Sequence, residues 1–172
     1  MTAVRVVGAG ELVGLRPALR ALLLDSVAHG ASIGFLDPFG PADADAYWDG
    51  VDAAVRSGGR VLLVAADAHG SVVGTAQLDV DTSPNQAHRA TVSKVLVHSA
   101  ARGRGIGAAL MAALDRAAAD AGRWLLTLDT ATAAAERLYA RTGWARAGAI
   151  PDYARDPDGT LTPTVLYYKS LR

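Results

Sequence analysis

A glycine-rich turn between an apolar strand and an amphipathic helix constrains the fold of this chain more than any other feature. The turn reads Arg102-Gly103-Arg104-Gly105-Ile106-Gly107-Ala108. The apolar run 92–97 before it predicts a strand, and apolar residues at helical spacing through 106–121 predict a helix. Such a turn leaves backbone N–H groups free at the positive end of a helix dipole, which favours an anion such as pyrophosphate. The three glycines would let a ligand approach the backbone without Cβ clashes.

Three kinds of pyrophosphate ligand compete for this turn. A nucleotide-binding P-loop needs Lys-Ser or Lys-Thr after its second glycine, and the chain has neither there. The spacing Gly103-x-Gly105-x-x-Ala108 matches a dinucleotide fingerprint, but too little sequence follows for the usual repeated βαβ halves. The third ligand is coenzyme A, because Arg-x-x-Gly-x-Gly over residues 102–107 resembles the acyl-CoA loop of the GNAT superfamily of N-acetyltransferases.

The resemblance to this superfamily extends beyond the turn. Residues 94–98 (Lys-Val-Leu-Val-His) resemble its fourth strand, and residues 125–129 (Leu-Leu-Thr-Leu-Asp) resemble its fifth. Residues 135–144 resemble its A-x-x-x-Y-x-x-x-G-[FWY] signature. Within the superfamily the chain is most similar to the tabtoxin-resistance type of acetyltransferase, on the residues 29–35, 126–130 and 157–164.

Composition and length exclude several other classes of protein. The 172 residues predict one domain, 1–172, and a net charge of zero argues against nucleic acid and anionic membranes as partners. The absence of cysteine excludes disulfides and a cysteine nucleophile, and the four histidines lack metal-ligand spacing, so no metal is expected. Without a membrane-length apolar run or a signal-peptide pattern, a cytoplasmic location is expected.

The hydrophobic pattern predicts the order β-α-α-β-β-β-α-β-α-β-β, an α/β mixed sheet with helices on both faces. The resemblance implies that this sheet splays at its centre, beside the strand that ends at residue 97. After the last predicted helix, a strand is expected over 144–150, a loop over 151–163 and a strand over 164–170.

Acetyl transfer to an amine needs an oriented thioester, a deprotonated amine and a proton donor for the departing thiolate. The resemblance implies that Val95, Leu96 and Val97 bind the pantetheine arm through their main chain. Asp129 ends a strand at the carboxyl edge, where it could orient or deprotonate the amine, or could instead cap the next helix. Tyr139 matches the family's tyrosine and is the candidate acid, with a core position as the alternative.

Phe35 and Trp48 lie in segment 28–58, where the family builds its acceptor pocket, although both could be core residues. The sequence therefore predicts an acetyl-CoA-dependent N-acetyltransferase that acts on a small primary amine, amino-acid-like or like an antibiotic or toxin. Direct attack in a ternary complex is expected. Dimers are common in the family, so the resemblance also suggests a homodimer. A protein N-terminal or lysine acetyltransferase and a non-catalytic CoA-binding regulatory module are the alternatives.

Overall fold

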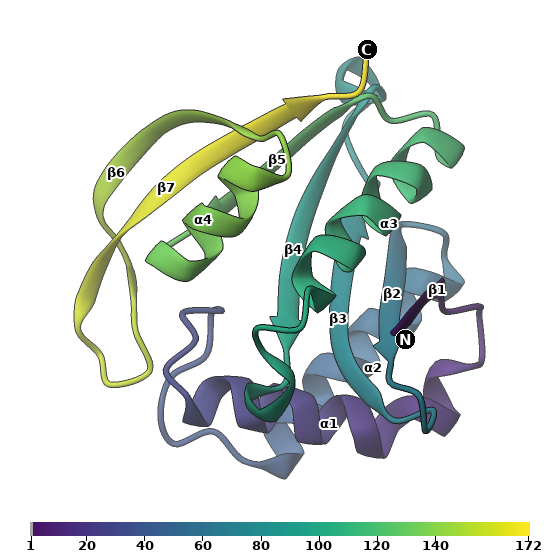
Figure 1. Cartoon of the computed structure of the whole chain (residues 1–172), viewed down its shortest axis with the longest axis vertical. Helices are drawn as coiled ribbons and strands as arrows, with labels where there is room; N and C mark the ends of the chain where they lie inside the picture. Colours follow the sequence, from purple (N-terminus) through teal and green to yellow (C-terminus); the bar gives the residue numbers. More distant parts are fainter. Residues whose placement is uncertain (1) are drawn as a thin grey trace.

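A computed structural model describes residues 2–172, which form a seven-stranded mixed sheet with helices on both faces (Figure 1). The strand order is β1-β2-β3-β4-β5-β7-β6. The predicted order of elements is confirmed, and their bounds are β1 Ala3–Val6, α1 Leu12–Ala28, α2 Pro41–Arg56, β2 Arg60–Ala66, β3 Val72–Asp79, β4 Arg89–Val97, α3 Ile106–Asp120, β5 Leu125–Thr130, α4 Ala133–Arg141, β6 Ala145–Arg155 and β7 Leu161–Ser170, with short 3-10 helices η1 Pro84–Gln86 and η2 Ser99–Ala101.

The sheet separates two hydrophobic cores, because successive side chains of a strand point to opposite faces. In β2, Leu63 and Ala65 pack in the core that includes α3, whereas Leu62 and Val64 pack in the core formed with α1 and α2. The strand is therefore buried on both faces. No helix in the described part of the chain is long and apolar enough to span a membrane.

Strands β4 and β5 form a parallel pair over only three residue pairs. Arg89 lies opposite Leu125, and the last pair joins Thr91 to Thr127. Beyond this point the two strands diverge (Figure 1), while β5 keeps its pairing with β7 from Leu125 to Thr130. Residues 92–97 of β4 and 128–130 of β5 are called the splayed strands below. This is the only parallel pair within residues 2–172, so the fold is not that of a dinucleotide-binding oxidoreductase with its parallel sheet.

A bulge in β4 lies at the start of the splayed strands. Ser93 pairs with Gln77 and Leu96 pairs with Thr75, so two residues of β4 oppose one residue of β3 between these pairs. Lys94, inside the bulge, has a φ of +50°, a left-handed conformation that residues with a Cβ seldom adopt.

The bulge reverses which face of the sheet each β4 side chain points to. Before it, Ala90 and Val92 pack in the core that includes α3. After it, Leu96 packs in the core formed with α1 and α2. A shift of one residue has this effect because side chains alternate with a period of two. Lys94 is thereby turned toward α1 and α2.

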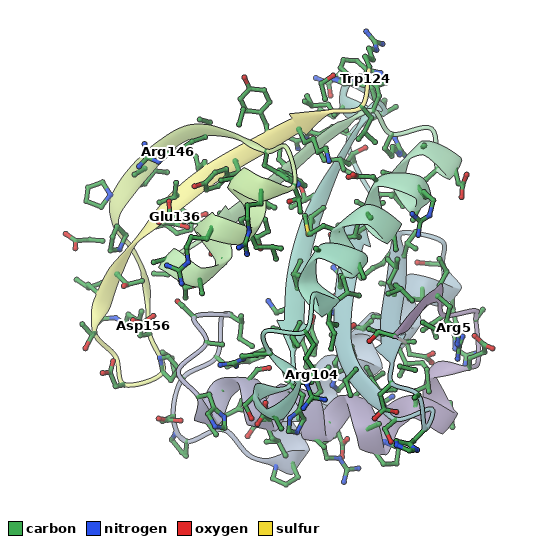
Figure 2. All side chains as sticks on the ribbon, in the orientation of Figure 1. Arg5, Arg104, Trp124, Glu136, Arg146 and Asp156 are labelled. Carbon is green, nitrogen blue, oxygen red and sulfur yellow. The ribbon has the colours of Figure 1, made fainter. Side chains whose placement is uncertain are left out.

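The prediction of a loop over residues 151–163 is wrong. Strand β6 continues to Arg155, and β7 begins at Leu161, so most of this segment is a long hairpin with Asp156 at its tip (Figure 2). Pro151 and Asp152 are typical of turns, but β6 is the edge strand of the sheet, where proline is tolerated. A register shift between Ile150 and Ala154 accommodates both residues.

Candidate active site

The glycine-rich turn adopts the backbone conformation that its glycines predict. Gly103 and Gly105 both have a φ of +78°, and Gly105 is the N-cap of α3. A Cβ at either position would meet no atom within 4 Å, so both face open space. No side chain caps the helix, which leaves its first N–H groups available to an anion.

Gly107 and Ile106, which were expected to contact a ligand, both take part in packing. A Cβ on Gly107 would lie 3.0 Å from Cδ2 of Leu138, so this glycine allows α3 to pack closely against α4. The side chain of Ile106 is buried in the core. Residues 106 and 107 can therefore contact a ligand through their backbone only.

Both arginines of the turn lie at the surface. The Nε of Arg102 donates a hydrogen bond to the carbonyl oxygen of Val97 at 3.3 Å, and Arg104 donates to the carbonyl oxygen of Ala100 at 3.1 Å. Arg104 projects from the turn near the start of α3 (Figure 2). Their remaining guanidinium donors are free for phosphate groups.

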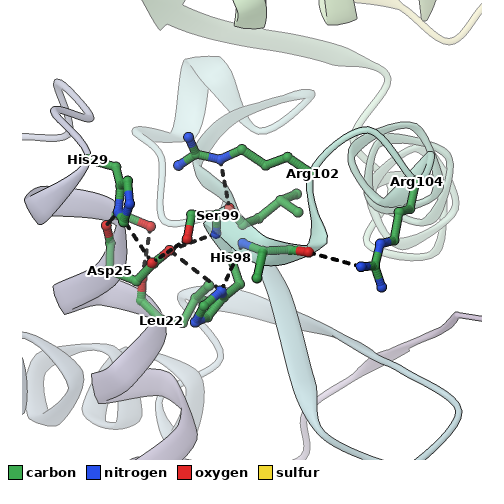
Figure 3. Close-up of polar contacts among 10 residues, drawn as sticks. Leu22, Asp25, His29, His98, Ser99, Arg102 and Arg104 are labelled. Carbon is green, nitrogen blue, oxygen red and sulfur yellow. Dashed lines mark hydrogen bonds and ion pairs between the residues drawn. The ribbon is translucent and has the colours of Figure 1, made fainter.

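Asp25 of α1 anchors the segment that precedes the turn (Figure 3). Its carboxylate accepts hydrogen bonds from the backbone N–H of Ser99 at 2.8 Å and from the Ser99 hydroxyl at 2.7 Å. His29 lies 3.3 Å and His98 3.8 Å from the same carboxylate. Burial acts to raise the pKa of Asp25, but the two bonds from Ser99 and the charge interactions with His98 and His29 together outweigh it, so the pKa is lowered overall. The only sequence signal was one acidic residue inside an apolar helical stretch.

Asp129 lies on the splayed part of β5 with its side chain exposed. The buried hydroxyl of Thr164 donates a hydrogen bond to it at 3.0 Å. The alternative role of helix cap belongs to Thr132, whose side chain accepts from the N–H of Ala135 at 3.3 Å. Asp129 therefore does not cap α4, and its backbone is fixed by the pairing of β5 with β7.

Tyr139 lies on α4 and is only 6% exposed. Its ring packs against Trp144 and Tyr167, with centroid distances of 6.0 and 5.7 Å. Burial, together with the negative charge of Asp129, raises the pKa of Tyr139 to about 12. The phenol therefore keeps its proton at any physiological pH.

The predicted acceptor residues fall into different environments. Trp48 is fully buried in the core of α1 and α2, so the expectation that it contacts substrate is not supported by its position. Phe35 is half-buried. Its ring packs edge-on against Tyr47, with a centroid distance of 5.3 Å, and at a tilt against Phe39, with a centroid distance of 4.5 Å. Tyr47, one residue before the expected tryptophan, is half-buried and contacts Phe35, a position that the sequence analysis assigned to Trp48.

The splayed segment of β4 has the properties that an extended ligand requires. Leu96 is buried, while Val95 and Val97 are half-buried. The edge of these residues that faces β5 makes no strand pairs. Unpaired backbone groups need hydrogen-bond partners. A pantetheine arm, with its amide groups, fits this edge, and the open glycines next to it fit a pyrophosphate.

Comparisons with known proteins agree with this geometry. Residues 57–146 match the family model described as acetyltransferase (GNAT) domain. An L-methionine sulfoximine/L-methionine sulfone acetyltransferase of Pseudomonas paraeruginosa is 32% identical over 138 residues, which are 78% of this chain and 77% of the relative.

Two solved structures share the fold. A ribosomal-protein-alanine N-acetyltransferase from Brucella melitensis aligns with a TM-score of 0.81 at 24% identity, over 98% of this chain and 99% of its own. A protein from Salmonella typhimurium, solved with its cofactor acetyl-CoA, aligns with a TM-score of 0.80 at 20% identity, over 100% of this chain and 95% of its own.

The chain belongs to the GNAT family of acetyltransferases. It is accordingly an N-acetyltransferase.

Replacing Gly105 with valine should abolish the rise in melting temperature that acetyl-CoA causes in the wild type. The left-handed φ of +78° strains any residue with a Cβ by about 1–2 kcal/mol, and the new side chain would fill the open space at the turn. Gly122, at the other end of α3, has a φ of +69° and equally open surroundings. Gly122→Val is therefore the control: it should lose similar stability and keep the response to acetyl-CoA. Equal responses in the two variants would contradict the assignment of the turn.

Proposed function

We propose that this enzyme transfers the acetyl group of acetyl-CoA to the amine of a small amino-acid-like compound, in the manner of the tabtoxin-resistance type. The observation that carries the proposal is the pairing of an exposed carboxylate, Asp129, with a buried neutral phenol, Tyr139, beside the splayed strands. The methionine sulfoximine/sulfone acetyltransferase of Pseudomonas supports the acceptor class.

When bound, acetyl-CoA supplies an acetyl group that its thioester linkage activates toward an amine. Asp129 attracts the ammonium form of the acceptor and accepts its proton, directly or through a water molecule. The Thr164 hydroxyl holds the carboxylate in place through its 3.0 Å hydrogen bond. Tyr139 holds a proton for the departing sulfur, since its raised pKa keeps the phenol neutral. The chain has no cysteine, so attack is direct, without an acetyl-cysteine enzyme.

A small acceptor fits the surroundings of the splayed strands better than a protein segment does. The loop between α1 and α2 contacts the turn of the β6–β7 hairpin, because the N–H of Asp37 donates to the carbonyl oxygen of Pro157 at 2.9 Å. This bridge joins two segments that are far apart in sequence. The bridge restricts the approach of a long peptide, whereas a protein acetyltransferase requires that a peptide can reach the site.

A panel of acceptors tests the proposal. Release of free thiol from acetyl-CoA is measured with L-methionine sulfone, other amino acids, dipeptides, aminoglycosides and short N-terminal peptides. The enzyme itself adds no thiol background, since it contains no cysteine. We expect the highest kcat/KM among the free amino acids, with intersecting double-reciprocal plots. A clear preference for peptides would replace the proposal with protein acetylation.

Tyr139→Phe keeps the packing against Trp144 and removes only the hydroxyl. We expect kcat to fall by roughly 10²–10⁴-fold, the usual contribution of general acid catalysis, with little change in the KM of the acceptor. Because the phenol pKa is about 12, the wild-type donor is present at every assay pH. The ratio of wild-type to variant kcat should therefore stay constant from about pH 7 to about pH 10. A ratio that grows with pH would assign Tyr139 as a base instead.

Asp129→Asn preserves the shape of the side chain and can still accept the hydrogen bond from Thr164. Loss of the charge should lower kcat/KM for the acceptor and move the pH optimum upward, where more of the amine is already neutral. Binding of acetyl-CoA, followed by calorimetry, should be unchanged. Because Thr132 caps α4, no loss of stability from uncapping is expected. Wild-type turnover in this variant would remove Asp129 from the mechanism.

A further inference from the structure

Lys94 is a half-buried cation without a counter-ion. Its Nζ lies 5.6 Å from the ring centroid of Phe35 and 5.7 Å from that of Tyr47. Within residues 2–172 this ammonium makes no ion pair and no hydrogen bond. The rings attract the positive charge through their faces, but they offer it no acceptor atom for hydrogen bonding. Three ammonium donors are therefore free at the splayed strands.

The other cation near Lys94 is already neutralised. Arg60 forms an ion pair with Asp79 at 3.1 Å and also donates to the side-chain oxygen of Gln77 at 3.2 Å. Burial lowers the pKa of Lys94, the charge of Arg60 lowers it further, and only the charge of Asp129 opposes this change. A second anion beside Lys94 would stabilise its charged form.

Asp129 connects Lys94 to the proposed catalytic residues. Its negative charge acts to raise both the pKa of Lys94 and the pKa of Tyr139. Lys94 and Asp129 nevertheless lie too far apart for an ion pair. The splayed strands thus present a fixed cation and a fixed anion that do not neutralise each other.

The backbone at Lys94 also indicates a functional constraint. The bulge both places Lys94 on the α1/α2 face and holds it at a φ of +50°. A lysine in this conformation is strained, and strained residues in folded proteins cluster at ligand-binding and active sites. Glycine or asparagine would fit the bulge with less strain, but neither carries a positive charge.

We propose that Lys94 binds the α-carboxylate of an amino-acid acceptor whose ammonium group faces Asp129. This inference rests on the proposed function and adds the residue that recognises the carboxylate of an amino-acid acceptor. A zwitterion carries its two charges on adjacent groups, and Lys94 and Asp129 provide one complementary charge for each. Phe35 and Tyr47 hold the lysine side chain in place, so that little ordering is needed when the acceptor binds.

A comparison of two acceptors in two enzymes tests this assignment. L-Methionine sulfone is compared with 3-(methylsulfonyl)propylamine, which has the same side chain and amine but no carboxylate. For methionine sulfone, Lys94→Gln should lower kcat/KM by about 10- to 100-fold, the range for a hydrogen bond to a charged group. The loss should lie in KM, because the carboxylate is bound equally before and during the reaction. Lys94→Arg should restore part of it.

For the amine without a carboxylate, Lys94→Gln should have little effect. Equal losses with both acceptors would show that Lys94 only supports the Phe35 and Tyr47 rings, and would overturn the proposal. If the wild type acetylates neither methionine sulfone nor any other amino acid, the proposed function fails and this inference fails with it. If the wild type acetylates amino acids and Lys94→Gln acetylates them equally well, only this inference fails.

A measurement that does not depend on turnover uses the fact that the chain has two lysines, Lys94 and Lys169. Lysine labelled with carbon-13 at Cε gives one NMR signal for each, and Lys94→Gln assigns them. With CoA bound, methionine sulfone should shift the Lys94 signal and raise its titration midpoint. Lys169, which is paired with Asp115 at 2.7 Å, is the internal control and should not respond. A silent Lys94 signal at saturating acceptor would contradict the proposal.

Discussion

Only three residue pairs join β4 to β5, and the active-site region depends on the divergence that follows. Strand β5 tolerates the loss because β7 pairs with it along its full length, and β4 remains paired with β3 on its other edge. On the side that faces β5, the backbone of residues 92–97 pairs with no strand. Because backbone groups without a strand partner need other hydrogen bonds, this edge suits an extended ligand that adds to the sheet as a further strand would.

Several elements hold this opening rigid. Asp25 anchors Ser99 at the beginning of the glycine-rich turn, so α1 determines where the turn lies. Gly107 lets α3 approach Leu138 of α4, and the Asp37–Pro157 hydrogen bond connects the two segments on either side. The proposed catalytic residues, Asp129 and Tyr139, therefore lie on a strand and a helix, and such elements give the fixed geometry that acyl transfer requires.

The environment of each polar group at the site differs from that of its neighbour. Tyr139 is buried against aromatic rings and stays protonated, whereas Asp129 is exposed on a strand end. Lys94 lies between these extremes, half-buried against two rings and without a partner among the described residues. The site thus separates a positive, a negative and a neutral group, which is the charge pattern that the proposed zwitterionic acceptor requires.

The order of the elements, the glycine-rich turn and the location of Tyr139 on a helix could be predicted from the sequence. These features are local: left-handed backbone favours glycine, and amphipathic periodicity repeats within a few residues. The hydrogen bonds between Asp25 and Ser99, the contact of Lys94 with Phe35 and the burial of Trp48 became visible in the folded chain alone. Residues 25 and 99 lie 74 positions apart, and no local pattern in either segment predicts that the two side chains meet. Contacts of this kind exist only after the sheet, with its bulge at Lys94, brings distant segments together.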